Sequence, residues 1–191
     1  PYIMLNHANN MDSVFTLAHE LGHGIHSLYA RRHSIMSQQP SLPFAETAST
    51  FCEMIVFEEL FNEIKDNKIK KAMLSERMSK AYATIIRQNY FVKFEIMAHE
   101  EIKKGITAEK LSDLYFKNLK EQFGSSIEID PLFRYEWTVI PHIFNSPFYC
   151  YAYNFGELLS LALYSEYKKK GKKFILVIEK ILAYGGSKKP E

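Results

Sequence analysis

Two histidines and a glutamate lie close together near the start of the chain, in the run His19-Glu20-Leu21-Gly22-His23. If this run is helical, residues four apart lie one turn above each other on the same face, so both imidazoles can reach one ion. Imidazole nitrogen suits Zn²⁺, which it binds at ~2.0–2.1 Å. The carboxylate of Glu20 is then well placed to accept a proton from a water molecule at the metal. The spacing therefore predicts a zinc centre with Glu20 as general base.

A carboxylate on the next apolar segment can supply a third ligand. Glu46 stands among Phe, Ala and Thr residues in positions 44–48, where burying an unpaired charge is costly unless it binds a metal or a partner. Glu53, two turns further along the same face, is the alternative ligand, or the acceptor for a ligand histidine. Three protein ligands leave one zinc position open, which is typical of a catalytic site. We predict that His19, His23 and Glu46 bind one Zn²⁺ per chain.

The helix that would carry the histidines follows from the spacing of apolar side chains. From Val14 to about Arg32 these recur with a helical period, after Asp12 or Ser13 as the expected N-cap. Gly22 weakens this helix by roughly 1 kcal/mol relative to alanine, as does Gly24. Small residues that weaken a helix in this way often mark the close approach of a ligand or of another backbone.

The rest of the chain reads as further helices joined by turns. A second helix over about residues 44–64, antiparallel to the first, would bring Glu46 toward the histidines. Thr107 is expected to cap a later helix and Gly124 to end it. Helices are expected over about residues 69–104, 107–123, 146–168 and 174–184, with an irregular stretch over 125–145 and at most a short strand over Tyr2–Leu5. The sequence thus predicts a mainly α fold forming a single domain over residues 1–191.

Composition excludes several classes of protein. Hydrophobic residues make up 47% of the chain and charged residues 24%, which argues against disorder. A net charge of +2 gives no reason to expect a nucleic-acid or membrane partner, and it predicts nothing about oligomeric state. Cys52 and Cys150 have apolar neighbours and are expected to be buried free thiols in a reducing compartment. The starting Pro1 and the turn-like residues 185–191 indicate a segment of a longer protein.

Longer stretches around these motifs are similar to a known family. Residues 15–27 and 44–51 resemble the oligoendopeptidase F family, which belongs with thimet oligopeptidase and neurolysin among the zinc metallopeptidases. The likeness runs in order through nearly the whole chain. Its further matches are Asp130-Pro131-Leu132-Phe133, Tyr135-Glu136-Trp137, Ile140-Pro141-His142 and Pro147-Phe148-Tyr149-Cys150-Tyr151.

The resemblance implies a zincin-like helical catalytic domain with a deep channel that admits short peptides and excludes folded proteins. It implies internal cleavage of oligopeptides in the cytoplasm. His19, His23 and Glu46 match the family's zinc ligands and Glu20 matches its base.

The resemblance also implies a group that binds the substrate carbonyl. His142 matches it together with tyrosines of the following segment. Tyr149 and Tyr151 are the preferred tyrosines, with Tyr153 behind them, although Tyr153 shares a helical face with Tyr149. The alternatives are a helical metallo-exopeptidase, and a catalytically inert fragment or peptide-binding module that retains the fold.

Overall fold

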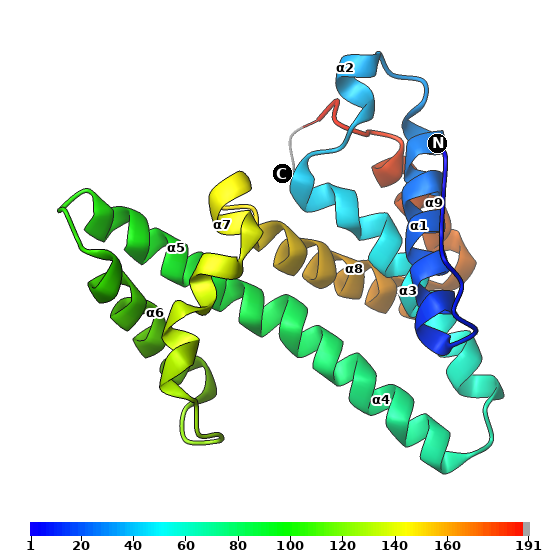
Figure 1. Cartoon of the computed structure of the whole chain (residues 1–191). Helices are drawn as coiled ribbons and strands as arrows, with labels where there is room; N and C mark the ends of the chain where they lie inside the picture. Colours follow the sequence, from blue (N-terminus) through cyan, green and yellow to red (C-terminus); the bar gives the residue numbers. More distant parts are fainter. Residues whose placement is uncertain (189–191) are drawn as a thin grey trace. The chain divides into compact units, whose positions relative to one another are not determined.

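The computed structural model describes residues 1–188 and is built from helices (Figure 1). The mainly α fold predicted from the sequence is confirmed. The sequence allowed at most a short strand over Tyr2–Leu5, and the structure has none there: this segment is largely exposed, and no strand exists within residues 1–188 to pair with it. Within the same residues, no helix combines the length and apolar character needed to cross a bilayer.

The helical elements follow one another with short connections. In chain order they are α1 (Met11–Ala30), α2 (Ile35–Gln38), α3 (Leu42–Glu63), α4 (Asn67–Ala81), the π-helical η1 (Tyr82–Arg87), α5 (Gln88–Ile102), α6 (Ala108–Phe123), the 3₁₀ turn η2 (Pro131–Val139), α7 (Pro141–Asn145), α8 (Tyr151–Lys170), the 3₁₀ turn η3 (Gly171–Phe174) and α9 (Ile175–Leu182). The chain divides into two compact units, Pro1–Ser79 with Phe155–Glu191, and Lys80–Asn154. A single domain over residues 1–191 stays a prediction.

Side-chain caps account for several helix boundaries. Asn10, rather than Asp12 or Ser13, caps α1, because its Oδ1 accepts the Ser13 backbone N–H at 2.9 Å. Thr107 caps α6 as predicted, accepting the Lys110 N–H, and Gly124 ends that helix with a φ of 57°.

The stretch expected to be irregular, residues 125–145, is partly helical. Its two prolines stand at the first positions of η2 and α7, where the missing N–H costs nothing, so they start helical turns here.

The expected long helix over residues 69–104 is interrupted by a π-helical turn. Within the second unit, the Asn154 side chain donates to the backbone oxygen of Ile85 at 2.9 Å, inside η1. The Ile85 oxygen thus accepts this side-chain N–H in addition to the backbone N–H of Gln88, and a side chain that bonds into the helix ladder in this way favours an irregular turn. No local sequence pattern signals this, since the partner lies 69 residues further along the chain.

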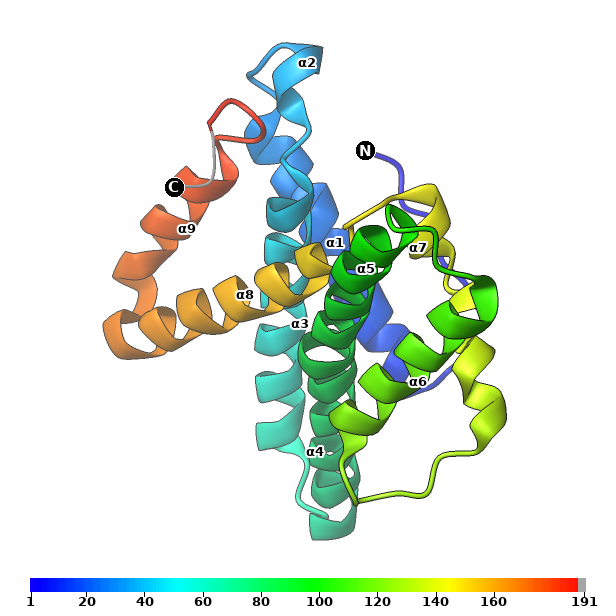
Figure 2. The ribbon, with the colours of Figure 1, turned by 90° about the vertical axis from the view of Figure 1, so that its left-hand side faces the viewer.

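The first unit is organised by the contact between α1 and α3, which lie alongside each other (Figures 1 and 2). The ring of Phe15 on α1 faces Phe57 on α3, while Gly22 meets Ala48 and Ser49, so the two helices run antiparallel. A Cβ atom added to Gly22 would lie 2.5 Å from the Ser49 Cα and 2.6 Å from the Ala48 carbonyl oxygen. Gly22 is therefore the point where the two backbones touch.

Each unit has its own apolar core. In the first, α3 packs on α8 and α9, which are joined by η3 (Figure 2). The buried Ser160 hydroxyl on α8 donates to the Thr47 carbonyl on α3 at 2.9 Å. In the second, α5 packs on α6, and the Trp137 indole N–H bonds Ser112 to hold η2 against α6. The core residues are Ala48, Phe51, Leu163, Phe174, Ile178 and Leu182 in the first unit, and Phe91, Phe94, Ala98, Leu111, Tyr115, Leu119, Ile140 and Cys150 in the second.

Replacing Gly22 with alanine should lower the free energy of unfolding by about 1–3 kcal/mol or more, because the new methyl group meets backbone atoms that cannot move aside. Denaturant unfolding measures this. Gly24→Ala on the same helix is the matched control. Its Cβ would contact only the tip of Ile3 at 3.4 Å, so better helix propensity should make it neutral or stabilising by up to about 1 kcal/mol. Equal effects of the two changes would contradict the close contact at Gly22.

Candidate metal centre and a histidine–tyrosine cluster

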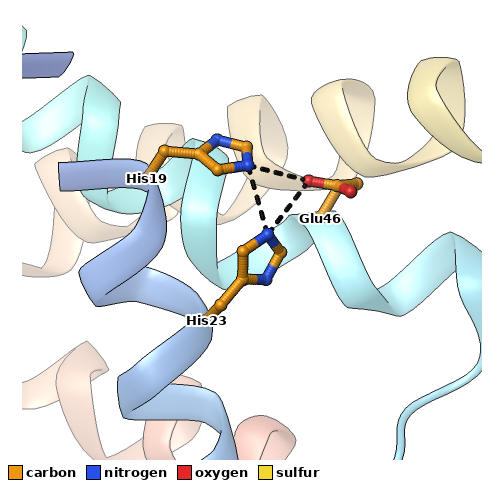
Figure 3. Close-up of side chains that lie close together, drawn as sticks. All are labelled: His19, His23 and Glu46. Atoms are coloured by element: carbon orange, nitrogen blue, oxygen red, sulfur yellow. Dashed lines mark hydrogen bonds and ion pairs between the residues drawn. The ribbon is translucent and has the colours of Figure 1, made fainter. Parts of the chain in front are cut away.

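Three side chains from α1 and α3 converge in the first unit, as Figure 3 shows. The Nε2 atoms of His19 and His23 lie 3.1 Å apart. Oε2 of Glu46 lies 3.3 Å from Nε2 of His19 and 3.6 Å from Nε2 of His23. The antiparallel packing of the two helices thus brings together the three residues predicted as metal ligands.

The spacing of these donor atoms fits a zinc ion. Tetrahedral coordination with bonds of ~2.0–2.1 Å separates neighbouring donor atoms by about 3.3 Å. The three observed separations, 3.1, 3.3 and 3.6 Å, lie around that value. Two imidazoles and one carboxylate also form a donor set that suits Zn²⁺. The residues present therefore fit the metal that the sequence predicts.

Glu53 fixes the orientation of the first histidine. Its Oε1 lies 2.6 Å from Nδ1 of His19, so the ring donates its Nδ1–H to this carboxylate and directs Nε2 toward Glu46. Of the two roles considered for Glu53, the contact expected of a hydrogen-bond acceptor for His19 is thus confirmed. Such a carboxylate increases the basicity of the imidazole and holds it in the ligating tautomer.

Two small residues position Glu46. Ser49, one turn further along α3, donates its hydroxyl to Oε2 of Glu46 at 3.1 Å. From the other side, Gly156 on α8 comes so close that a Cβ added there would lie 2.9 Å from the Cβ of Glu46. Neither residue was singled out from the sequence. The signals that could have found them are the i, i+3 spacing of Ser49 and an isolated glycine inside a helix.

The charges of this cluster are strongly coupled. Burial lowers the pKa of His19, but hydrogen bonds and charge interactions with Glu46 and Glu53 outweigh burial and raise this pKa to about 10. The hydrogen bond from His19 in turn holds the pKa of Glu46 below its usual value, against the opposing effect of burial. Without metal, an imidazolium therefore balances two carboxylates. A divalent cation bound at Nε2 of His19 would replace the proton on that nitrogen.

Glu20 lies on α1 between the two histidines in sequence and is half-buried. Within residues 1–188, no hydrogen bond or ion pair engages its carboxylate, in contrast to Glu46 and Glu53. It is thus an uncommitted proton acceptor on the helix that carries both imidazoles. Its role as general base stays a prediction.

A second group of predicted site residues lies in the other unit. Nε2 of His142, on α7, is hydrogen-bonded to the Tyr153 hydroxyl at 3.1 Å. The His142 ring is stacked on Tyr149, with centroids 5.6 Å apart and planes 8° from parallel, and Tyr153 meets both rings edge-on. Tyr151 lies outside this cluster and is 46% exposed. The structure therefore groups His142 with Tyr149 and Tyr153, while the roles predicted for Tyr149 and Tyr151 are untested by it.

Comparison with known proteins identifies the family. The sequence pattern of peptidase family M3 matches residues 1–191. The chain belongs to peptidase family M3. Oligopeptidase PepF of Bacillus subtilis (strain 168) is 35% identical over 198 residues, covering 100% of this chain and 29% of the relative. The oligoendopeptidase F homolog of Borreliella burgdorferi is 38% identical over 195 residues, covering 100% of this chain and 33% of the relative.

A solved structure agrees with this assignment to family M3. The crystal structure of oligoendopeptidase-F from Enterococcus faecium superposes with a TM-score of 0.78 at 31% identity, covering 92% of this chain and 32% of that one. The resemblance to oligoendopeptidase F and the helical metallopeptidase fold are therefore confirmed. The chain spans about a third of the length of the curated M3 relatives that it matches.

Removing the candidate ligand Glu46 should abolish metal binding, whereas removing its neighbour Glu53 should only weaken it. We expect Glu46→Ala to lose zinc on dialysis, and Glu53→Ala to bind zinc about 10–100-fold more weakly. Competition with a chromophoric chelator measures both affinities. Undiminished zinc in Glu46→Ala, with loss in Glu53→Ala, would exchange the two roles.

Gly156→Ala tests whether α8 positions the ligand. The added methyl group would displace Glu46, so zinc affinity should fall at least about tenfold while the helical content is retained. The control is Ser160→Ala on the same helix, which removes a hydrogen bond to Thr47 but does not touch Glu46. If both variants bind zinc as the unmodified protein does, α8 has no part in placing the carboxylate.

Proposed function

We propose that the protein is a zinc-dependent endopeptidase that hydrolyses internal peptide bonds of short oligopeptides in the cytoplasm. The observation that carries the proposal is the convergence of three donor atoms, 3.1 to 3.6 Å apart, from two helices in a member of peptidase family M3. Membership of the family, together with the names of its oligopeptidase relatives, supports peptides as substrates.

In the first unit, some residues would hold the metal and another would transfer a proton. His19, His23 and Glu46 would bind the ion, and Glu53 would keep the His19 ring in place. Bound zinc lowers the pKa of a water molecule to about 7 and polarises a carbonyl group. Glu20 accepts the proton that the attacking water loses and delivers it to the nitrogen of the leaving amine. Its lack of another partner within residues 1–188 leaves the carboxylate available for both transfers.

His142 and tyrosines of the segment that follows it are proposed to supply hydrogen-bond donors to the substrate. His142, Tyr149 and Tyr151 are proposed to bind the carbonyl oxygen on which negative charge develops, and removing one such donor typically lowers kcat by about 10²–10³. The contact of Tyr153 with Nε2 of His142 supports an oriented imidazole rather than a mobile one. The exposure of Tyr151 makes its hydroxyl accessible to a ligand.

Replacing Glu20 with glutamine should retain zinc and lose nearly all hydrolysis. The amide has similar size but cannot accept the proton, so we expect kcat to fall by about 10²–10⁴. The measurement is cleavage of an internally quenched peptide, with zinc content determined on the same sample. Full activity in this variant would exclude Glu20 as the base.

Peptides blocked at both ends separate an endopeptidase from an exopeptidase. We expect an acetylated and amidated peptide to be cleaved at an internal bond, which mass spectrometry of the products identifies. Cleavage that requires a free terminus would favour the exopeptidase. Zinc binding by the intact protein without cleavage of any blocked or unblocked peptide would favour a binding module.

A further inference from the structure

The turn before α8 contains a residue in an unfavourable backbone conformation. Phe148 has a φ of 60°, and among the described residues Asn9 is the other non-glycine residue with a positive φ. Asparagine tolerates this left-handed region, whereas the Cβ of a bulky aromatic residue is disfavoured there. This turn also explains why α8 begins at Tyr151 rather than at the predicted Ser146 or Pro147. Some other contact must hold Phe148 in place.

Helix α5 provides that contact at two points. Oε1 of Glu95 accepts the backbone N–H of Phe148 at 2.7 Å, and the His99 ring, one turn further along α5, lies 4.9 Å from the Phe148 ring. Glu95 is only 1% exposed, and within residues 1–188 no cation is paired with it. A buried carboxylate is costly unless it is hydrogen-bonded, and a bond from an N–H to a carboxylate is stronger than one between neutral groups.

The turn held in this way determines where Tyr149 points. Tyr149 directly follows Phe148, its N–H bonds the Ser146 carbonyl at 3.0 Å, and its own carbonyl accepts the N–H of Ala152 at 2.9 Å. Its ring is stacked on His142, at the start of the preceding helix α7. The stack therefore links α7 to the connection that precedes α8, next to the residue whose N–H Glu95 binds.

We infer that Glu95 is a positioning residue: by binding the Phe148 N–H, its carboxylate fixes the turn that stacks Tyr149 on His142. Glu95 itself does not contact a substrate. The consequence for catalysis rests on the proposed function, in which His142 and Tyr149 bind the substrate carbonyl. The consequence for the geometry of the stack does not.

The experiment compares Glu95→Leu, which cannot accept the N–H, with Glu95→Gln, which still can. The intact protein carries ¹³C-labelled histidine, and the His142 signal is assigned by its loss in His142→Gln. Stacking on Tyr149 displaces this signal upfield through the ring current. Glu95→Leu should lose the displacement and show a kcat about 10–100-fold lower at unchanged zinc content. Glu95→Gln should keep the displacement of the His142 signal and a kcat within about threefold of that of the unmodified protein. Glu100→Leu, at an exposed position on the same helix, is the control and should change neither.

The inference is overturned if Glu95→Leu keeps the His142 displacement, and its catalytic part is overturned if the displacement is lost while kcat is unchanged. Should Glu95→Leu fail to fold, adding Phe148→Asn decides the matter, because asparagine adopts the left-handed conformation more readily. Restored folding and a restored displacement support the inference, and continued failure assigns Glu95 to core packing instead. If the unmodified protein cleaves no peptide, the proposed function fails, while the NMR comparison still tests the positioning role.

Discussion

The backbones of α1 and α3 are in direct contact at Gly22, and the geometry of the candidate metal centre depends on that contact. His19 lies three residues before this glycine and His23 one after it, while on α3 the opposing point is Ala48 and Ser49, two to three residues after Glu46. A side chain at position 22 would separate the helices and increase the distance from the imidazoles to Glu46. Gly22 lowers the helix propensity of α1, but it allows the close approach that leaves the donor atoms 3.1 to 3.6 Å apart.

Electrostatics make the same place favourable for a cation. Three carboxylates, those of Glu20, Glu46 and Glu53, are carried by the two helices beside His19 and His23. Two of them are already bonded to His19, which explains why that imidazole holds its proton so tightly without metal. A divalent ion would satisfy the same two carboxylates, Glu46 directly and Glu53 through the His19 ring. Glu20, the third carboxylate, is engaged by no hydrogen bond or ion pair within residues 1–188.

The grouping of His19, His23 and Glu46 could be predicted from the sequence because its determinants are local. The i, i+4 spacing of the histidines, a lone carboxylate in an apolar helix and a glycine at a helix interface are all visible within residues 19–46. What could not be predicted depends on partners distant in the chain. The π-helical turn needs Asn154, the late start of α8 needs Glu95, and the approach of α8 to Glu46 needs Gly156. Likewise Tyr153, placed behind Tyr151 on sequence grounds, contacts His142 because the turn at Phe148 rotates the residues that follow.

Anomalous diffraction at the zinc edge tests most directly whether one divalent cation binds between α1 and α3. Crystals of the protein prepared with zinc should give a single strong anomalous peak, ~2.0–2.2 Å from Nε2 of His19, Nε2 of His23 and a carboxylate oxygen of Glu46. A peak bound elsewhere, or one held by the histidines with Glu46 turned away and no other acid in its place, would contradict the account.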